Sequence, residues 1–533
     1  MTEKQPVYIL PEDSQRVIGR DAQRNNILAA RVVAETIKTT LGPKGMDKMI
    51  VDSSGSIIVT NDGVTILEEM QIEHPAAKMI VEIAKTQEQE VGDGTTTVVM
   101  LAGKLLENAE KLLDQKIHPT VIARGYRMAA EKSQEILKQL AVELTSENQL
   151  LKIAQTAMTG KGAEYVKEKF DNIIVKAIKF IYENGKVNLD NIKIEKQRGK
   201  AVEDTSLIEG IVIDKERLSI EMPKKISDAR IALVDCAIEI KSPERETKIS
   251  ISSPEQLQSF LESEERILRG MVEKIRSVGA NVLLCQKGID DVAQYYLAKA
   301  GIYAARRVSQ SDIRKVSMAT GAKIITNIKE INESDIGFAL NVEEIKEGDD
   351  SLTYITGCKN PKAITILIRG GSDHVIDEIE RALKDGLGDV ASALKDSKVV
   401  AGGGAVEIEL AKRLRELAPT IKGREQFAIN EFASALEFIP ITLAENAGLD
   451  PLDTLTELKE AHEKGGKNFG LNLFIEKIED TLNSGIIEPL KIKTQAITSA
   501  SEVAMMILRI DDVIASGKIK EKSSSLNAMS GYD

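Results

Sequence analysis

Hydrophobic side chains recur at helical intervals in both terminal parts of the chain. From Asp21 to Leu41 the apolar positions lie three or four residues apart, and Gly42-Pro43 ends the segment. Further helices are predicted to start near Pro75 and to cover about Thr95–Leu113 and Pro119–Leu140. Two short strands between them, Lys48–Asp52 and Ser56–Thr60, are predicted to form a hairpin. After Gly402 the helical pattern returns and continues to about Ile514.

The middle of the chain follows a different pattern. Between about Ile226 and Arg369, short β-rich runs alternate with helical segments, which predicts an α/β domain of roughly 150 residues. The predicted strands are Arg230–Asp235, Asn281–Cys285, Ala304–Val308, Lys323–Thr326 and Ala363–Ile368, and the predicted helices are about Asp290–Lys299 and Ser311–Ala319.

One long amphipathic helix is predicted inside this middle part. Ser253 suits the N-cap and Pro254 the first helical position. A polar, loop-like segment precedes the helix, as in an insertion that projects from its domain. The residues fit an ordinary packed helix equally well.

The composition narrows the possible classes of protein. A chain of 533 residues is too long for one hydrophobic core, so about two to four domains are expected. Trp is absent and the net charge is -12, which argues against a nucleic-acid partner. No apolar run reaches the roughly 18 to 20 residues of a membrane helix, and the first residues lack the pattern of a signal peptide. We therefore expect a cytoplasmic protein with reduced cysteines, no membrane partner and a disordered polar tail from Lys518.

The strongest candidate for a functional site is the segment from Gly92 to Thr97. Its two glycines allow backbone N–H groups to approach a ligand, and its threonines open a helix, whose N-terminus favours phosphate. Asp93 would repel phosphate unless a cation lay between them, and Mg²⁺ combines carboxylates with phosphate oxygens in this way. The same residues also fit an Asp-Gly turn before a threonine-capped helix, and the chain contains no Walker A motif.

Three other glycine-rich turns add candidate residues. They are Thr40–Gly45 with Lys44, Thr60–Gly63 with Asp62, and Thr159–Gly162 with Lys161. Each alone is an ordinary turn signal. Together they supply carboxylates, a lysine and glycine turns, which metal-assisted phosphoryl transfer needs to hold the γ-phosphate, neutralise its charge and orient a water.

These segments belong to an ordered series of motifs that resembles the group II chaperonins. The similarity is greatest to the subunits of the archaeal thermosome, which are related to the eukaryotic cytosolic chaperonin. The motifs are LGPKGMDKM (41–49), TNDGVTIL (60–67), HPAAKM (74–79), VGDGTTTVV (91–99), MTGKGAE (158–164), CQKGIDD (285–291), VVAGGGAVEIEL (399–410) and RIDDVI (509–514). The resemblance runs from about residue 7 to about residue 516.

The resemblance implies a multidomain α and α/β chaperonin fold. Residues 1–147 and 403–533 would form a mainly helical equatorial ATP-binding domain. Residues 148–218 and 369–402 would form a small α/β intermediate hinge domain, and residues 219–368 an α/β apical domain that binds substrate. The helix after Ser253 would belong to a helical protrusion at about residues 241–270, which forms a built-in lid.

The resemblance also implies a site for ATP or ADP and Mg²⁺. Asp93 would be the magnesium ligand, Asp62 and Asp385 would orient the attacking water, and Lys161 would sense the γ-phosphate. The other nucleotide-binding residues would be Gly42, Gly94, Thr95, Thr96, Thr97, Thr159, Gly403, Gly404 and Glu488. Asp385 would reach the nucleotide only when the hinge domain closes. Gly386 replaces the family's usual alanine beside it and predicts a looser helix there.

The implied function is ATP-dependent assistance to protein folding. Identical or homologous subunits, about eight to a ring, would form two stacked rings that bind unfolded proteins and enclose them under the lid while hydrolysing Mg-ATP. The polar tail lacks the family's Gly-Gly-Met repeats. Two alternatives from other classes are a metabolic phosphotransferase and a passive binding protein without turnover. The acids Asp62, Asp93 and Asp385 argue against the passive protein.

Overall fold

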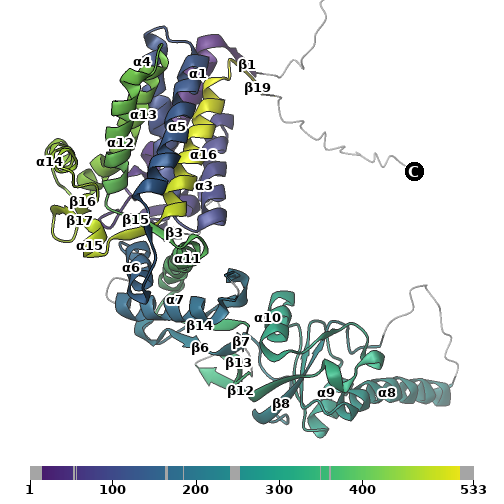
Figure 1. The fold of residues 1–533 in the computed structure, drawn as a ribbon. Coiled ribbons are helices and arrows are strands. Elements are labelled where there is room, and N and C mark those ends of the chain that lie inside the picture. Colours follow the sequence, from purple (N-terminus) through teal and green to yellow (C-terminus); the bar gives the residue numbers. More distant parts are fainter. Residues whose placement is uncertain are drawn as a thin grey trace, which may run out of the picture.

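The computed structural model describes residues 15–51, 55, 57–161, 166–183, 185–240, 253–347, 350–358 and 362–515. Three regions follow one another in space: a helical region, a small connecting region and an α/β region (Figure 1). The chain passes from the first to the third and then returns through the connecting region to the helical one.

The helical region joins the two ends of the chain. Its helices are α1 (Gly19–Lys38), α2 (Gly63–Glu69), α3 (Pro75–Val91), α4 (Thr95–Asp114), α5 (Pro119–Leu140), α12 (Ala405–Leu417), α13 (Glu425–Asn446), α14 (Pro451–Glu463), α15 (Thr481–Ser484) and α16 (Leu490–Leu508). One hydrophobic core takes side chains from both ends, and in it the rings of Tyr126 and Phe432 meet edge to face at 5.7 Å. The helices predicted at both ends are confirmed, and α3 and α5 begin at the expected prolines.

Helix α13 is the one helix in the described residues that is long and apolar enough to cross a membrane by length and composition. Of its most apolar window, 67% is buried inside the structure. The helix packs against α4, α5 and α12. Its apolar composition therefore matches its central place in the helical region.

The connecting region is made of two separate stretches of chain. The first carries α6 (Glu147–Met158), α7 (Lys167–Ile181), β5 (Ile192–Arg198) and β6 (Ser206–Ile208), and the second carries β14 (Ile364–Gly370) and α11 (Asp373–Asp396). Strand β14 runs parallel to β5 and antiparallel to β6. The strand predicted over Ala363–Ile368 thus exists, but its assignment to the α/β region was wrong. Its buried isoleucines pack into the same core as α7 and α11, which holds the two stretches together.

The α/β region is built on a seven-stranded sheet with the order β10-β9-β8-β12-β13-β7, and β11 pairs with β8. Its strands are β7 (Gly210–Ile213), β8 (Lys225–Val234), β9 (Val282–Cys285), β10 (Tyr303–Ala305), β11 (Ile324–Ile325), β12 (Gly337–Glu347) and β13 (Asp350–Thr356). The predicted helices appear as α9 (Asp291–Lys299) and α10 (Gln310–Thr320). The three cysteines are free thiols, and burial raises the pKa of Cys285 to about 12.

Helix α8 (Pro254–Ser277) begins where the sequence predicts. The Ser253 hydroxyl accepts a hydrogen bond from the N–H of Gln256 at 3.3 Å. Its later turns are buried through Leu268 and Val272, whereas Leu261 in an earlier turn is 54% exposed. In Figure 1 the helix extends beyond the sheet, so it projects from the α/β region. Residues 241–252 of the predicted protrusion lie outside the described part of the chain.

Besides the pair β16 (Phe469–Asn472) and β17 (Lys477–Asp480), two short β-ribbons lie at the surface of the helical region. Strand β1 (Gln15–Ile18) pairs with β19 (Asp512–Ala515), and β2 (Lys48–Val51) pairs with β3 (Ile57–Thr60) as the predicted hairpin. The second ribbon exposes apolar side chains, with Met49 69% and Val51 61% accessible. The predicted polar tail from Lys518 lies outside the described residues.

Candidate active site

A cavity of about 400 Å³ lies where the helical region meets the connecting region. This volume is in the usual range for small-ligand pockets, about 300–1,000 Å³. Twelve of the predicted site residues line it: Gly42, Asp62, Asp93, Gly94, Thr95, Thr96, Thr97, Thr159, Lys161, Gly403, Gly404 and Glu488. Asp385 is not on the wall but contacts it through Lys161. The structure therefore gathers motifs that are far apart in the sequence around one cavity.

The loop between α3 and α4 forms one wall of the cavity. Gly92 ends α3 and Gly94 caps α4, both with left-handed backbone conformations (φ 87° and 79°) that favour glycine. The buried side chain of Gln87 donates hydrogen bonds to the carbonyl oxygens of Asp93 (3.0 Å) and Ile492 (3.3 Å). These contacts fix the loop so that the first turn of α4 faces the cavity. The N–H groups there have no partner within the helix and carry partial positive charge, which suits an anion.

The glycine turns around Gly42 and Gly160 lie against each other. Gly42 and Gly160 both have positive φ angles, 81° and 83°. A Cβ atom on Gly160 would come within 2.9 Å of the Pro43 Cα, so the two backbones approach closely. The Asn61 amide, in the turn Thr60–Gly63, donates a hydrogen bond of 2.7 Å to the Gly160 carbonyl. Three segments predicted separately as turns thus form one continuous surface.

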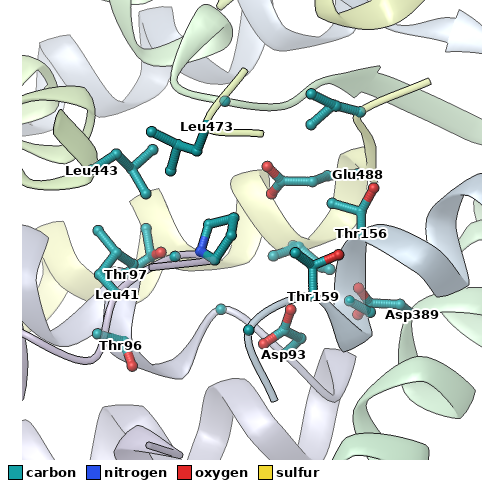
Figure 2. A pocket seen from close by; sticks show the side chains of 18 of the residues that line it. Leu41, Asp93, Thr96, Thr97, Thr156, Thr159, Asp389, Leu443, Leu473 and Glu488 are labelled. Carbon is teal, nitrogen blue, oxygen red and sulfur yellow. The ribbon is translucent and has the colours of Figure 1, made fainter. Parts of the chain in front are cut away.

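The two ends of the cavity differ in chemistry, as Figure 2 shows. Leu41, Leu443 and Leu473 gather at one end, and they belong to one buried apolar cluster. Asp93, Asp389 and Thr159 lie at the other end. Gly403 closes the apolar end, where its carbonyl accepts a hydrogen bond of 2.8 Å from the Leu471 N–H in β16 (Phe469–Asn472). A ligand with a flat apolar ring and a charged end fits this division.

A lysine joins two carboxylates at the charged end. The Lys161 ammonium donates to Asp385 Oδ2 and lies 3.6 Å from Asp93 Oδ1. Burial raises the pKa of Asp385 to about 8; Lys161 opposes this shift, and Asp93 and Asp62 add to it. Burial alone would lower the pKa of Lys161, but Asp385 and Asp93 outweigh it and the net shift is upward. Lys161 is therefore a permanent positive charge beside the cavity.

Asp385 is predicted to reach the nucleotide only when the hinge domain closes, and this stays a prediction. In this conformation it is bonded to Lys161, and its side chain is 14% exposed. Both residues come from the connecting region, while Asp93 lies in the helical region. The three side chains thus bridge the two regions in this conformation. Helix α11 continues through Gly386, and a looser helix at this residue stays a prediction.

Asp62 has a second role that the sequence did not show. It is the N-cap of α2, and its Oδ2 accepts hydrogen bonds from the Thr65 N–H (2.9 Å) and hydroxyl (2.6 Å). These bonds fix the orientation of the carboxylate at the cavity wall. The N-cap role is enough to explain an aspartate at position 62. That Asp62 also lines the cavity is a separate observation.

A buried ion cluster near Glu488 was missed in the sequence. The Lys493 ammonium lies 2.7 Å from Glu488 Oε2 and 2.9 Å from Glu407 Oε1. Burial raises the pKa of Glu488, and Lys493 opposes the shift. The lysine side chain is only 9% exposed, so the cluster holds the Glu488 carboxylate in place. Its members are separated in sequence and only the fold shows that they meet.

Comparison with known proteins agrees with this geometry. The profile of the TCP-1/cpn60 chaperonin family matches residues 33–518. The chain is 59% identical over 524 residues to thermosome subunit alpha of Archaeoglobus fulgidus, covering 97% of this chain and 96% of that one. It is 58% identical to the thermosome subunit of Methanopyrus kandleri (97% and 96% covered) and 56% identical to that of Pyrococcus horikoshii (97% and 95% covered).

The fold is that of a chaperonin, and the chain belongs to the TCP-1/cpn60 chaperonin family. Within that family it is of the group II type, similar to archaeal thermosome subunits. It is an ATP-dependent protein-folding chaperone with ATPase activity, one subunit of a multi-subunit complex. The metabolic phosphotransferase and the passive binding protein are thereby excluded.

Proposed function

We propose that the 400 Å³ cavity is the ATP site of this chaperone. The observation that carries the proposal is the division of the cavity into an apolar end and a charged end (Figure 2). The adenine ring would lie against Leu41, Leu443 and Leu473, with the ribose near Glu488. The phosphates would reach the first turn of α4, where Thr95, Thr96 and Thr97 present N–H and hydroxyl groups. ADP would occupy the same site after hydrolysis.

The residues present fit a magnesium ion held together with the phosphates. The described residues contain no group of three or more His, Cys, Asp or Glu side chains placed to hold a metal by themselves. Mg²⁺ does not need one, because it takes one or two carboxylates with phosphate oxygens and water. Asp93 on the cavity wall would be that carboxylate, and the ion would neutralise phosphate charge during transfer.

Hydrolysis would depend on three side chains around the γ-phosphate. Lys161 would hold its negative charge, while Asp62 and Asp385 would orient the attacking water and Asp385 would take its proton. Asp62 is already fixed by its hydrogen bonds to Thr65. Because Lys161 and Asp385 come from the connecting region, a movement of that region would remove or restore both at once. This supports coupling between hydrolysis and motion.

We expect changing Asp93 to asparagine to weaken Mg²⁺-dependent ATP binding by about tenfold or more, since an amide is a poor substitute for a carboxylate ligand. The measurement is the equilibrium affinity for ATP as the Mg²⁺ concentration rises. Asp47→Asn, at an exposed site in the helical region, is the control and should behave as the unchanged protein. An unaltered Mg²⁺ dependence in Asp93→Asn would remove Asp93 from the site.

The three regions correspond to the proposed equatorial, intermediate and apical domains. The strand pairings favour domain boundaries for the intermediate domain that differ from residues 148–218 and 369–402, the bounds implied by the resemblance. Strand β7 belongs to the α/β sheet and β14 to the connecting region, so the intermediate domain would cover about residues 144–208 and 363–397. Unfolded proteins would bind the apical domain, and the projecting α8 would form part of the lid. We place this activity in the cytoplasm.

The two surface ribbons support a specific mode of assembly. A two-stranded ribbon has unpaired edges, and the β2–β3 ribbon also exposes Met49 and Val51. A free strand edge can pair with a strand of another chain. In a second copy of this chain, the β1–β19 ribbon has strands that could pair with the edge of β2–β3. We propose that this pairing joins neighbouring subunits in each of two stacked rings, with about eight subunits per ring.

This assembly predicts that the double variant Met49→Asp with Val51→Asp breaks the rings into smaller species, because charges would replace the exposed apolar face. Negative-stain images and size-exclusion chromatography would show the change. Leu452→Asp is the matched control, since it places a charge at another exposed apolar position, 72% accessible, on α14. Intact rings in the double variant would contradict the pairing.

A further inference from the structure

Asp389 is a buried carboxyl group for which the proposed mechanism has no use. It lies on α11 one turn after Asp385, and its residue is 3% exposed. It also lines the cavity, beside Asp93 and Thr159 in Figure 2. Its Oδ1 atom is enclosed and has no hydrogen-bond partner in the part of the chain that the structure describes. Buried polar atoms nearly always have partners. The other buried carboxylates with an unpartnered oxygen in the described residues, Asp171 and Glu407, do not line this cavity, so at Asp389 the oxygen points to a missing ligand there.

The charges around Asp389 do not supply that partner. Burial raises the pKa of Asp389 well above its usual range, and Asp93, Asp385 and Glu488 raise it further. Lys161 is the positive charge that opposes the shift, but it already donates to Asp385. Lys167 also lines the cavity, but it donates to the Thr159 hydroxyl, and neither lysine is bonded to Asp389.

The backbone holds Asp389 close to the loop that carries Asp93. A Cβ atom built on Gly388 would lie 2.9 Å from the Gly92 Cα, so α11 meets this loop with no side chain between them. The two glycines directly precede Asp389 and Asp93 in the sequence. This close approach brings two carboxylates from different regions to the same end of the cavity (Figure 2).

We propose that Asp389 is a second carboxylate ligand, alongside Asp93, of the divalent cation that enters with ATP. The proposal rests on the assignment of Asp93 as a magnesium ligand. Mg²⁺ is bound through one or two carboxylates plus phosphate oxygens, so the pair completes the protein's share of the shell. A cation would also give the unpartnered carboxyl group of Asp389 a partner and balance the carboxylates that gather at this end of the cavity.

The proposal predicts opposite effects of removing the Asp389 carboxylate on two affinities, that for the divalent cation and that for ATP without metal. Removing the Asp389 carboxylate takes away a ligand, so the affinity for the divalent cation falls. It also removes a negative charge next to the triphosphate, so the affinity for ATP without metal stays the same or rises. A residue with only a packing role would, when replaced, weaken both affinities together.

The test uses the assembled full-length protein and Mn²⁺ as a paramagnetic probe. The protein is saturated with a non-hydrolysable ATP analogue, and free Mn²⁺ is followed by electron paramagnetic resonance. Asp389→Asn should weaken Mn²⁺ binding about tenfold or more. Its affinity for the analogue in EDTA should equal or exceed that of the unchanged protein.

Two further variants sharpen the test. Asp389→Val keeps a similar side-chain volume and should weaken Mn²⁺ binding in the same way. Asp171→Asn is the matched control, because Asp171 is 1% exposed on α7 and does not line the cavity. It should leave Mn²⁺ binding unchanged.

Two results would count against the proposal. Unchanged Mn²⁺ affinity in Asp389→Asn and Asp389→Val overturns it, and so does a parallel loss of Mn²⁺ and metal-free analogue affinity. If Asp93→Asn weakens Mn²⁺ binding and Asp389→Asn does not, only the role of Asp389 fails. If neither variant weakens binding, the assignment of Asp93 fails as well.

Discussion

Replacing Asp385 with alanine is expected to lower ATP turnover by a factor of about 10² to 10⁴, the usual contribution of a positioned general base. Nucleotide binding should change little, because Asp385 does not line the cavity wall. The loss leaves Lys161 without its bonded carboxylate, so it remains free to hold the γ-phosphate. Steady-state phosphate release and equilibrium binding of ATP, measured on the same preparation, separate the two effects.

The pH dependence of turnover provides a second readout for Asp385. A general base must be unprotonated, and burial raises the pKa of this carboxyl to about 8. The rate should therefore rise with pH and level off above about 8, while the residual rate of Asp385→Ala should lack this rise. Asp396→Ala, an exposed acid at the end of the same helix, is the control and should keep full turnover. Normal turnover in Asp385→Ala would exclude it as the base.

The second large effect is expected from one methyl group on α11. A Cβ atom at Gly388 would lie 2.9 Å from the Gly92 Cα and 3.4 Å from the Val91 carbonyl, where only backbone could yield. Gly388→Ala should push α11 away from the loop and carry Asp385 with it. A displacement of about 1 Å at a catalytic group can cost about 10²-fold in rate. Turnover should fall by that order while the protein remains folded and assembled.

Gly386→Ala on the same helix is the matched control. Its Cβ atom would meet Ile174 Cδ1 at 2.5 Å, and that atom is the end of a side chain that can move. Alanine also favours the helix over glycine by about 1 kcal/mol. Turnover in Gly386→Ala should stay close to that of the unchanged protein. An equal loss of turnover in Gly386→Ala and Gly388→Ala would mean that any added side-chain volume on α11 lowers the rate. The contact between Gly388 and Gly92 would then not be the cause.

Local signals in the sequence predict much of the fold. The first residues of α3, α5 and α8 are predicted by a proline at the first helical position and by the capping side chain that precedes it. The apolar spacing within α1 and α4 is strong enough to give both helices to within a few residues. These features depend on neighbouring residues only, so no knowledge of the fold is required.

The sequence does not predict which distant strands pair with each other. Strand β14 is a clear apolar run, but nothing in it shows that its partners are β5 and β6. The β12–β13 hairpin was missed because polar residues such as Glu343 and Lys346 hide its alternation. In both cases the partner strand decides the structure, and a single segment does not identify that partner.

The same limit applies to the candidate site. The glycine turns are visible in the sequence because a left-handed backbone conformation favours one residue type, as at Gly92 and Gly94. Glu407 and Lys493 look like ordinary helix charges until the fold brings them to Glu488. Asp389 carried one available signal, an acid four residues after Asp385 on an otherwise apolar helix face.

We propose that ATP hydrolysis at this cavity drives protein folding, with Asp385 as its base. The most direct measurement is the recovery of activity by a chemically denatured enzyme in the presence of the assembled protein and ATP. The unchanged protein should raise the yield above the spontaneous level. Asp385→Ala should bind the denatured enzyme and limit its aggregation without raising that yield. An equal yield with Asp385→Ala would show that folding does not depend on hydrolysis through Asp385.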